Sequence, residues 1–113
     1  MFARRDEDDY QAVAPGIRRR TLCFGRTTLM TEFRLLHNHV LPTHGHPHEQ
    51  TGYLVSGHIA LTIGDETHDV VPGDSWCISG GVQHGAQVLQ DSVAVEVFSP
   101  VRKDYLPDGA TTA

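Results

Sequence analysis

Short apolar stretches separated by turn-forming residues limit the fold of this 113-residue chain more than any other feature. Turn signals built from glycine, proline and aspartate recur at a spacing of roughly 8–12 residues, which is typical of sandwiches and barrels. Residues 27–36 alternate as a half-buried strand does, with Leu29, Phe33 and Leu35 on one face. Since no stretch has a convincing helical period, we expect an all-β domain of roughly eight or nine short strands.

The chain is long enough for one core and too short for two lobes. Residues 1–16 alternate in charge and end at a Pro-Gly breaker, which predicts an arm that is flexible or exchanged in a dimer. The strand pattern predicts a small β-barrel or jelly roll over 17–106, and the small polar residues 107–113 predict a disordered tail. A domain of this size must cover its sheet edges, so we expect a homodimer.

Charge and composition narrow the possible partners. Lys+Arg 9 against Asp+Glu 14 gives a formal net charge of −5, which argues against nucleic acid because phosphate binding needs a positive surface. No apolar run has the length of a membrane span, and the N-terminal residues lack the apolar core of a signal peptide. Cys23 and Cys77 form no disulfide or metal pattern. We expect a cytoplasmic protein that binds neither nucleic acid nor membranes.

Histidines are concentrated between positions 44 and 48, at the start of a β-like run. His44 and His46 have the period of a strand, so both imidazoles should face the same side, and Gln50 keeps that parity. His84 follows a Gly-Gly turn and is the candidate for a further ligand. Neutral imidazole is the commonest protein ligand for divalent transition metals, so these four residues predict a metal site.

These residues match the two motifs of the cupin superfamily, which the chain therefore resembles. The pattern of the first motif, G-x5-HxH-x3,4-E-x6-G, is matched by His44-x-His46-x3-Gln50-x6-Gly57, but its first Gly is missing, since Asn38-His39 occupies that turn. The second motif, G-x5-P-x-G-x2-H-x3-N, is matched by Gly73-x5-Ser79-x-Gly81-x2-His84. The resemblance implies a single-domain cupin barrel with one divalent ion per subunit, drawn from nickel, zinc, manganese, iron or cobalt.

The chain departs from the cupin pattern at three positions. Gln50 replaces the usual Glu, Ser79 replaces Pro, and Val88 replaces Asn. With three neutral imidazoles and a neutral amide, a bound ion keeps its full charge of +2, which favours Lewis-acid chemistry. Redox chemistry with O2 fits less well, because non-haem iron sites usually contain a carboxylate.

A narrower resemblance comes from the string around His44–Tyr53 together with Val-Phe-Ser-Pro-x-Arg-x-Asp-Tyr-Leu near the C-terminus. Both are similar to the pectin-degradation-protein type of cupin, whose members open the ring of 4,5-unsaturated uronates to 4-deoxy-5-keto acids. By that resemblance the metal ligands are His44, His46, Gln50 and His84, and the pocket is lined by Glu96, Phe98 and Arg102. The type typically has Asp where this chain has Glu96, so the carboxyl group reaches one methylene further.

The chemistry expected of these residues follows from their side chains. Glu96 is a candidate catalytic acid or base that moves a proton as an enol becomes a ketone. Arg102 is the second candidate catalytic residue and can pair with a substrate carboxylate in bidentate fashion. Phe98 is a candidate substrate-binding residue, and it shares strand parity with Glu96, so both can face one cavity. The substrate would be a small carboxylated sugar derivative, and the enzyme an isomerase or lyase.

Two other functions fit the same ligand set. One is a metal-dependent dioxygenase, which would need O2 and ferrous ion. The other is a non-catalytic cupin that binds a small molecule, which is favoured if Glu96 and Arg102 both point to solvent. Outside the site, we expect His37 and His39 at the surface, His48 at the surface or beside the metal ligands, and Trp76 and Tyr53 in the core or a dimer contact.

Overall fold

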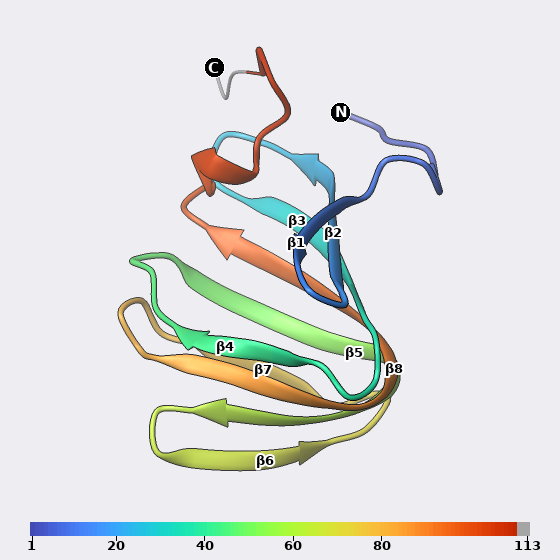
Figure 1. Ribbon diagram of the computed structural model, residues 1–113. Coiled ribbons are helices and arrows are strands. Elements are labelled where there is room, and N and C mark those ends of the chain that lie inside the picture. Colours follow the sequence, from blue (N-terminus) through green and yellow to red (C-terminus); the bar gives the residue numbers. More distant parts are fainter. Residues whose placement is uncertain (111–113) are drawn as a thin grey trace.

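The computed structural model describes residues 1–110, and it is built almost entirely of strands (Figure 1). The prediction of an all-β fold is confirmed, with one turn of 3-10 helix as the exception. The elements are β1 (Gln11–Ala14), β2 (Ile17–Phe24), β3 (Leu29–Leu35), β4 (Val40–His44), β5 (Glu49–Ile63), β6 (Glu66–Val70), β7 (Ser75–Ile78), β8 (His84–Ser99) and the helix η1 (Lys103–Tyr105).

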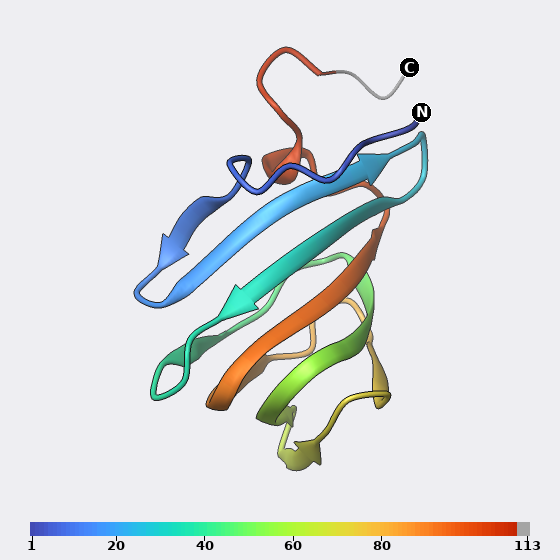
Figure 2. The same ribbon diagram turned by 90° about the vertical axis from the view of Figure 1, so that its right-hand side faces the viewer.

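Two long strands, β5 and β8, organise the sheet. They pair with each other antiparallel along most of their length, and the sheet order is β1-β2-β3-β8-β5-β6. The first part of β8 also pairs with β4, and its second part pairs with β3, while the first part of β5 pairs with β7. Because both long strands bend, the sheet curves around one interior, as Figures 1 and 2 show.

The bend corrects one expectation. The sequence predicts a turn at Gln90-Asp91, but β8 runs through both residues without a break. The register of β5 against β8 shifts three times between Leu54 and Ile59, and Gly57 has a φ of 96° in this region. A Cβ atom at Gly57 would lie 2.1 Å from Ser92 Oγ, so glycine allows the two bent strands to cross closely here.

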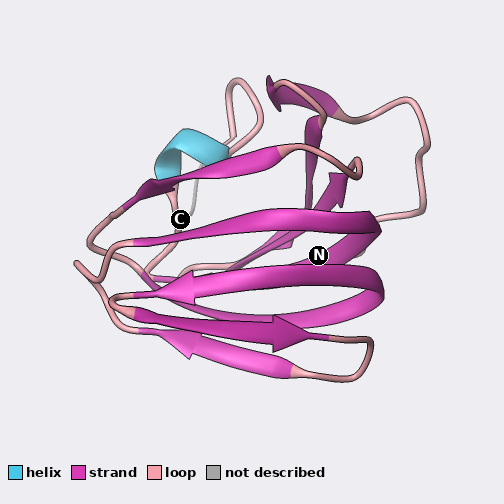
Figure 3. Ribbon diagram, turned by 60° about the horizontal axis from the view of Figure 1, so that its bottom comes forward, coloured by secondary structure: helices cyan, strands magenta, loops and turns pink. Residues whose placement is uncertain are grey.

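Buried apolar side chains fill the space between the layers seen in Figure 3. The larger cluster takes Ile17 from β2, Leu35 from β3, Leu54 and Leu61 from β5, and Val88 from β8. A smaller cluster near the C-terminal segment contains Leu29, Phe98 and Val101. The alternation of buried and exposed residues along the first half of β5 fixes which side chains face the interior.

Both terminal segments lie at the same end of the barrel (Figure 1). Within residues 1–16, the strand β1 pairs with β2, and Asp9 contacts the guanidinium of Arg20 at 3.2 Å. The predicted tail, 107–113, lies partly outside the described residues. Among residues 1–110, no helix is long and apolar enough to cross a membrane.

Candidate metal centre

Three histidines from three parts of the chain meet inside the barrel. His44 is the last residue of β4, His46 lies in the loop that follows, and His84 is the first residue of β8. One ring nitrogen of each lies within 4.8 Å of the others, and they form the one such group found among the described residues. The predicted convergence of His44, His46 and His84 is therefore observed.

The local reason for this convergence differs from the expected one. The sequence places His44 and His46 on one strand, but β4 ends at His44 and β5 begins at Glu49. The intervening loop is held by a hydrogen bond from the Gly81 N–H to the His46 carbonyl oxygen, at 2.8 Å. A Cβ atom at Gly80 would lie 2.3 Å from the Pro47 carbonyl oxygen, so the Gly-Gly turn packs directly against this loop.

The hydrogen bonds of two histidines decide which ring nitrogen is free. Nδ1 of His44 lies 2.9 Å from the Pro42 carbonyl oxygen, and Nδ1 of His84 lies 2.9 Å from the Val82 carbonyl oxygen. A carbonyl oxygen only accepts, so Nδ1 carries the proton in both rings and Nε2 keeps its lone pair. Nε2 of His84 is buried without a hydrogen-bond partner, which is the state expected of a nitrogen that binds an ion.

Burial also prepares the histidines for metal binding. Desolvation lowers the pKa of His84 and of His46 below the usual value, and neighbouring positive groups add to this effect. A ligand histidine must be neutral to donate its lone pair. His44 and His84 therefore present a free Nε2 lone pair to a divalent ion, and burial favours the neutral form of His46 and His84.

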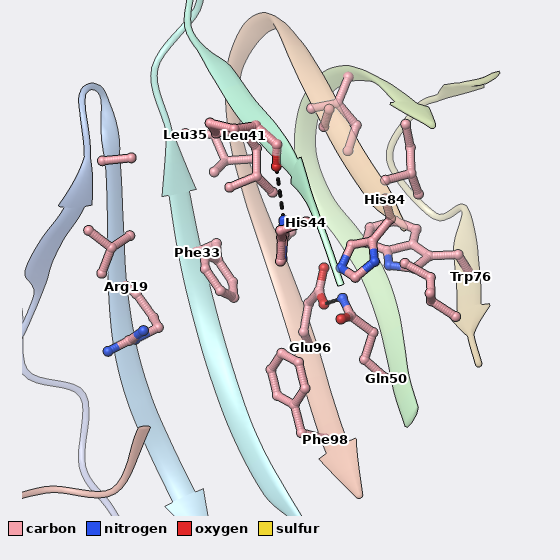
Figure 4. Close-up of a pocket in the computed structure, with 18 of the residues that line it drawn as sticks. Arg19, Phe33, Leu35, Leu41, His44, Gln50, Trp76, His84, Glu96 and Phe98 are labelled. Carbon is pink, nitrogen blue, oxygen red and sulfur yellow. Dashed lines mark hydrogen bonds between the residues drawn. The ribbon is translucent and has the colours of Figure 1, made fainter. Parts of the chain in front are cut away.

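Gln50 connects the histidines to the carboxyl group of Glu96. Its side chain is 4% exposed and lies at the start of β5. Its Oε1 lies 2.6 Å from His46 Nε2, while its Nε2 donates a hydrogen bond to Glu96 Oε2, as Figure 4 shows. The two contacts fix the orientation of the amide, with its oxygen toward the histidines.

Glu96 faces the interior from β8, beside Gln50. Burial raises the pKa of its carboxyl group to about 8, and this effect outweighs the opposing influence of Trp76, Gln50 and Arg102. A carboxyl group with a pKa near neutrality, in a cavity beside metal ligands, is the pattern of a group that transfers protons.

His44, His84, Gln50 and Glu96 line one cavity of about 330 Å³. Phe98, which is 1% exposed, lies in its wall with its ring centroid 5.6 Å from that of His46. Arg102 also lines the cavity, as does Trp76 on β7. The side chains of Glu96 and Arg102 therefore both reach the cavity, and neither points only to solvent.

The edge of the Arg102 guanidinium that can bind a carboxylate through two nitrogens is already occupied by Asp104. Its Nε and Nη2 contact the two oxygens of Asp104, at 3.3 Å and 2.8 Å, and its Nη1 donates to the Tyr105 hydroxyl at 2.8 Å. The guanidinium also stacks on the Tyr105 ring, 3.8 Å from its centroid. The sequence does not indicate these contacts, because Asp104 and Tyr105 lie after the last strand, where no strand pattern shows how the chain folds back.

Two further residues near the site have positions that the sequence describes only in part. Trp76 packs against the larger core cluster, as expected, and it also lines the cavity. The Trp76 ring packs closely over Gly52. This contact follows from the pairing of β7 with β5, which cannot be recognised in the sequence alone. His48 is half-buried beside His46, with ring centroids 5.6 Å apart, so of its two expected positions it takes the one beside a candidate ligand.

The comparisons with known proteins agree with this architecture. The Cupin_2 family of cupin domains matches residues 31–100. The solved structure of KdgF from Halomonas sp. shares 31% identity, covers 94% of this chain and 98% of its own, and superposes with a TM-score of 0.88. None of the curated proteins matches the chain.

More distant structures show the same fold. An RmlC-like cupin from Shewanella frigidimarina shares 23% identity over 93% of this chain and 95% of its own, with a TM-score of 0.87. A predicted oxalate decarboxylase from Thermotoga maritima shares 14% identity over 88% of this chain and 99% of its own, with a TM-score of 0.77. The fold and the histidine cluster define a single-domain cupin. The chain belongs to the cupin family and, within it, is of the KdgF-like type.

Proposed function

We propose that this protein is a metal-dependent isomerase that opens the ring of 4,5-unsaturated uronates. The substrate class comes from the resemblance to the pectin-degradation-protein type and from the likeness to KdgF of Halomonas. The observation that carries the proposal is the position of the Glu96 carboxyl group, which shares one cavity with His44 and His84 and contacts Gln50. This arrangement supports a catalyst over a protein that only binds a small molecule.

The residues that would hold the ion are His44, His46, His84 and Gln50. A divalent ion bound there supplies Lewis-acid polarisation of a substrate oxygen. Because all four ligands are neutral, the site favours an anionic substrate such as a uronate. We expect one ion per subunit, and the ligands accept nickel, zinc, manganese, iron or cobalt.

Glu96 would act on the proton that moves during the reaction. Ring opening breaks the bond between C1 and the ring oxygen while the proton of the C1 hydroxyl moves to that oxygen, which gives an aldehyde at C1 and an enol at C5. Tautomerisation then takes a proton from the enol oxygen and adds one to C4, so the product is an isomer of the substrate. Glu96 is the carboxyl group in the cavity placed to carry this proton.

Arg102 and Phe98 would orient the sugar. Phe98 presents an apolar wall against one face of the ring, beside His46. The Arg102 guanidinium lines the same cavity, but Asp104 already contacts its Nε and Nη2. A substrate carboxylate would therefore have to share the guanidinium with Asp104 or replace it.

The test uses protein loaded with Zn²⁺ and a 4,5-unsaturated uronate. We expect the ultraviolet absorbance of the conjugated enol ether to fall faster than in the spontaneous reaction. A rate equal to the spontaneous one, with the ion bound in stoichiometric amount, would exclude the proposal. Oxygen uptake with Fe²⁺-loaded protein would then be the next measurement, since it reports a dioxygenase.

We further propose that the protein acts in the cytoplasm as a homodimer.

A further inference from the structure

We propose that the indole N–H of Trp76 positions the carboxyl group of Glu96, and that Gly52 provides the space for this contact. The inference rests on the proposed function only in its catalytic consequence. The contact itself depends only on where Gly52, Trp76 and Glu96 lie on three neighbouring strands.

The three residues form one row across the sheet. Gly52 on β5 pairs directly with Trp76 on β7, and it pairs on its other side with Glu96 on β8. Residues directly opposite each other on neighbouring strands project to the same face. Trp76 and Glu96 therefore project into the cavity from either side of a residue that has no side chain.

The indole ring occupies the place where a side chain at Gly52 would lie. A Cβ atom built on Gly52 would lie 2.2 Å from both Cε2 and Nε1 of Trp76. The indole nitrogen thus lies above the β5 backbone, one strand spacing of about 4.8 Å from the row position of Glu96. Gly52 does not have a positive φ, so a tight turn does not explain why glycine is found here.

The indole N–H has no other use among the described residues. Nε1 of Trp76 is buried and has no hydrogen-bond partner. A buried N–H without a partner is costly, and a small movement of Glu96 satisfies it. The side of the cavity that Trp76 occupies is visible in Figure 4, next to His84 and Gln50.

A second donor matters because Gln50 has two tasks. Its amide oxygen faces His46, so its orientation is tied to the metal centre, and its N–H2 group reaches Glu96. One donor leaves the carboxyl group free to rotate about that hydrogen bond. With Trp76 as a second donor on the other side, the remaining oxygen lone pairs are aimed at the substrate.

The direct test does not depend on activity. Trp76 is the single tryptophan of the chain, so a ¹H–¹⁵N spectrum of Zn²⁺-loaded protein contains one indole cross-peak. We expect Glu96→Ala to move the indole proton upfield, because it removes the acceptor. Thr31→Val is the matched control, since the Thr31 hydroxyl lies near Glu96 but donates to its backbone oxygen. An indole shift in Glu96→Ala no larger than in Thr31→Val overturns the proposal.

The catalytic consequence is tested by kinetics. Trp76→Phe keeps a ring and loses the N–H, and we expect kcat to fall about tenfold with KM and zinc content unchanged. In a Glu96→Asp background, which retracts the carboxyl group by one methylene, the same substitution should cost less than twofold. Equal losses in both backgrounds would mean that Trp76 acts only on structure.

The two proposals fail in different ways. A wild-type protein without ring-opening activity removes the proposed function, while the indole spectrum still decides whether Trp76 contacts Glu96. Should Trp76→Phe fold poorly, Gly52→Ala displaces the indole by contact and keeps its N–H. We expect that variant to give the same upfield shift, and an unmoved cross-peak contradicts the proposal.

Discussion

At the scale of single residues, the amide of Gln50 explains why this cupin has Gln where the family pattern has Glu. A carboxylate at position 50 could donate no hydrogen bond to Glu96, and its negative charge would oppose ionisation of the Glu96 carboxyl group beside it. The amide instead offers an oxygen to the histidine side and an N–H2 group to Glu96. One residue therefore serves both the metal centre and the proton-transfer group.

We predict that Gln50→Glu keeps the ion and loses activity. A carboxylate is a good metal ligand, but it removes a donor from Glu96 and cancels one unit of the ion's charge. We expect kcat to fall by about tenfold or more, with about one ion per subunit. Metal analysis and the ultraviolet assay on the same sample measure both quantities, and an unchanged kcat would contradict this account of Gln50.

We also predict that Glu96→Gln lowers kcat by roughly 100-fold while zinc binding is retained, because an amide cannot carry the proton. Arg34→Gln is the control, since Arg34 binds Glu7 and Glu32 away from the cavity and its loss should leave kcat unchanged. The two variants are compared by the ultraviolet assay at saturating substrate. A Glu96→Gln enzyme that retains full activity would remove Glu96 from the mechanism.

The sequence predicted the histidines well because their spacing is a local property. It could not predict what holds Arg102, because its partners Asp104 and Tyr105 depend on how the C-terminal segment folds back. Trp76 was missed for a similar reason. Its position in the cavity follows from strand pairing, and a single tryptophan in a short strand carries no signal of what lies opposite.

At the scale of elements, the candidate centre joins β4, β5 and β8 with the loop after β4. An ion bound to these elements stabilises the folded state by mass action, by about 2.7 kcal/mol at 100 times Kd. We therefore predict that Zn²⁺ raises the Tm by about 10 °C. His84→Ala should lose this increase, whereas His68→Ala, in β6 outside the cluster, should retain it. Scanning calorimetry with and without Zn²⁺ measures the shift, and an increase that survives in His84→Ala argues against the site.

The bend in β5 gives a prediction about stability. Gly57→Ala adds a Cβ that meets Ser92 Oγ at 2.1 Å, at a residue with a φ of 96°. Gly73 has nearly the same φ, 97°, with no atom within 4 Å of the added Cβ, so Gly73→Ala measures the backbone strain alone. We expect about 1 kcal/mol for Gly73→Ala and about 3 kcal/mol for Gly57→Ala. Urea unfolding measures both, and equal losses would show that the clash with Ser92 is relieved at no cost.

Local patterns predicted the strands and most turns, but they predicted a turn at Gln90-Asp91 that is absent. Polar residues in the middle of a bent strand give the same sequence pattern as a turn, because both faces of the strand are exposed to solvent at the bend. The bent strand is recognised by its partner: Ser92 is buried, accepts a hydrogen bond from the His58 N–H and donates one to the Gln90 carbonyl oxygen. That information is contained in the pairing of β5 with β8 rather than in either stretch alone.

At the scale of the whole molecule, the outer face of the central strands is unusually apolar for a surface. Tyr53 and Val55 on β5 are 50% and 48% exposed, and Met30 on β3 is 37% exposed. Tyr53 pairs with Val95 and Met30 pairs with Val97, so valines of β8 join them across the sheet. Apolar side chains on the outer face of three neighbouring strands, with Glu32 opposite Val95 at their edge, indicate a contact surface.

We predict that a second copy of this chain covers that face, because identical apolar sheet faces pack against each other about a two-fold axis. Tyr53→Glu should shift the protein to monomer, since each copy would place a buried carboxylate opposite another. Leu89→Glu is the matched control, because Leu89 is also exposed, at 45%, but lies in the other half of β8.

Sedimentation equilibrium gives the mass of the wild-type protein and of both variants. A wild-type monomer at high micromolar concentration, or a Tyr53→Glu dimer, would show that the valines and Tyr53 do not form the interface. Retention of zinc and of Tm by a monomeric Tyr53→Glu variant would then show that the metal centre is complete within one subunit.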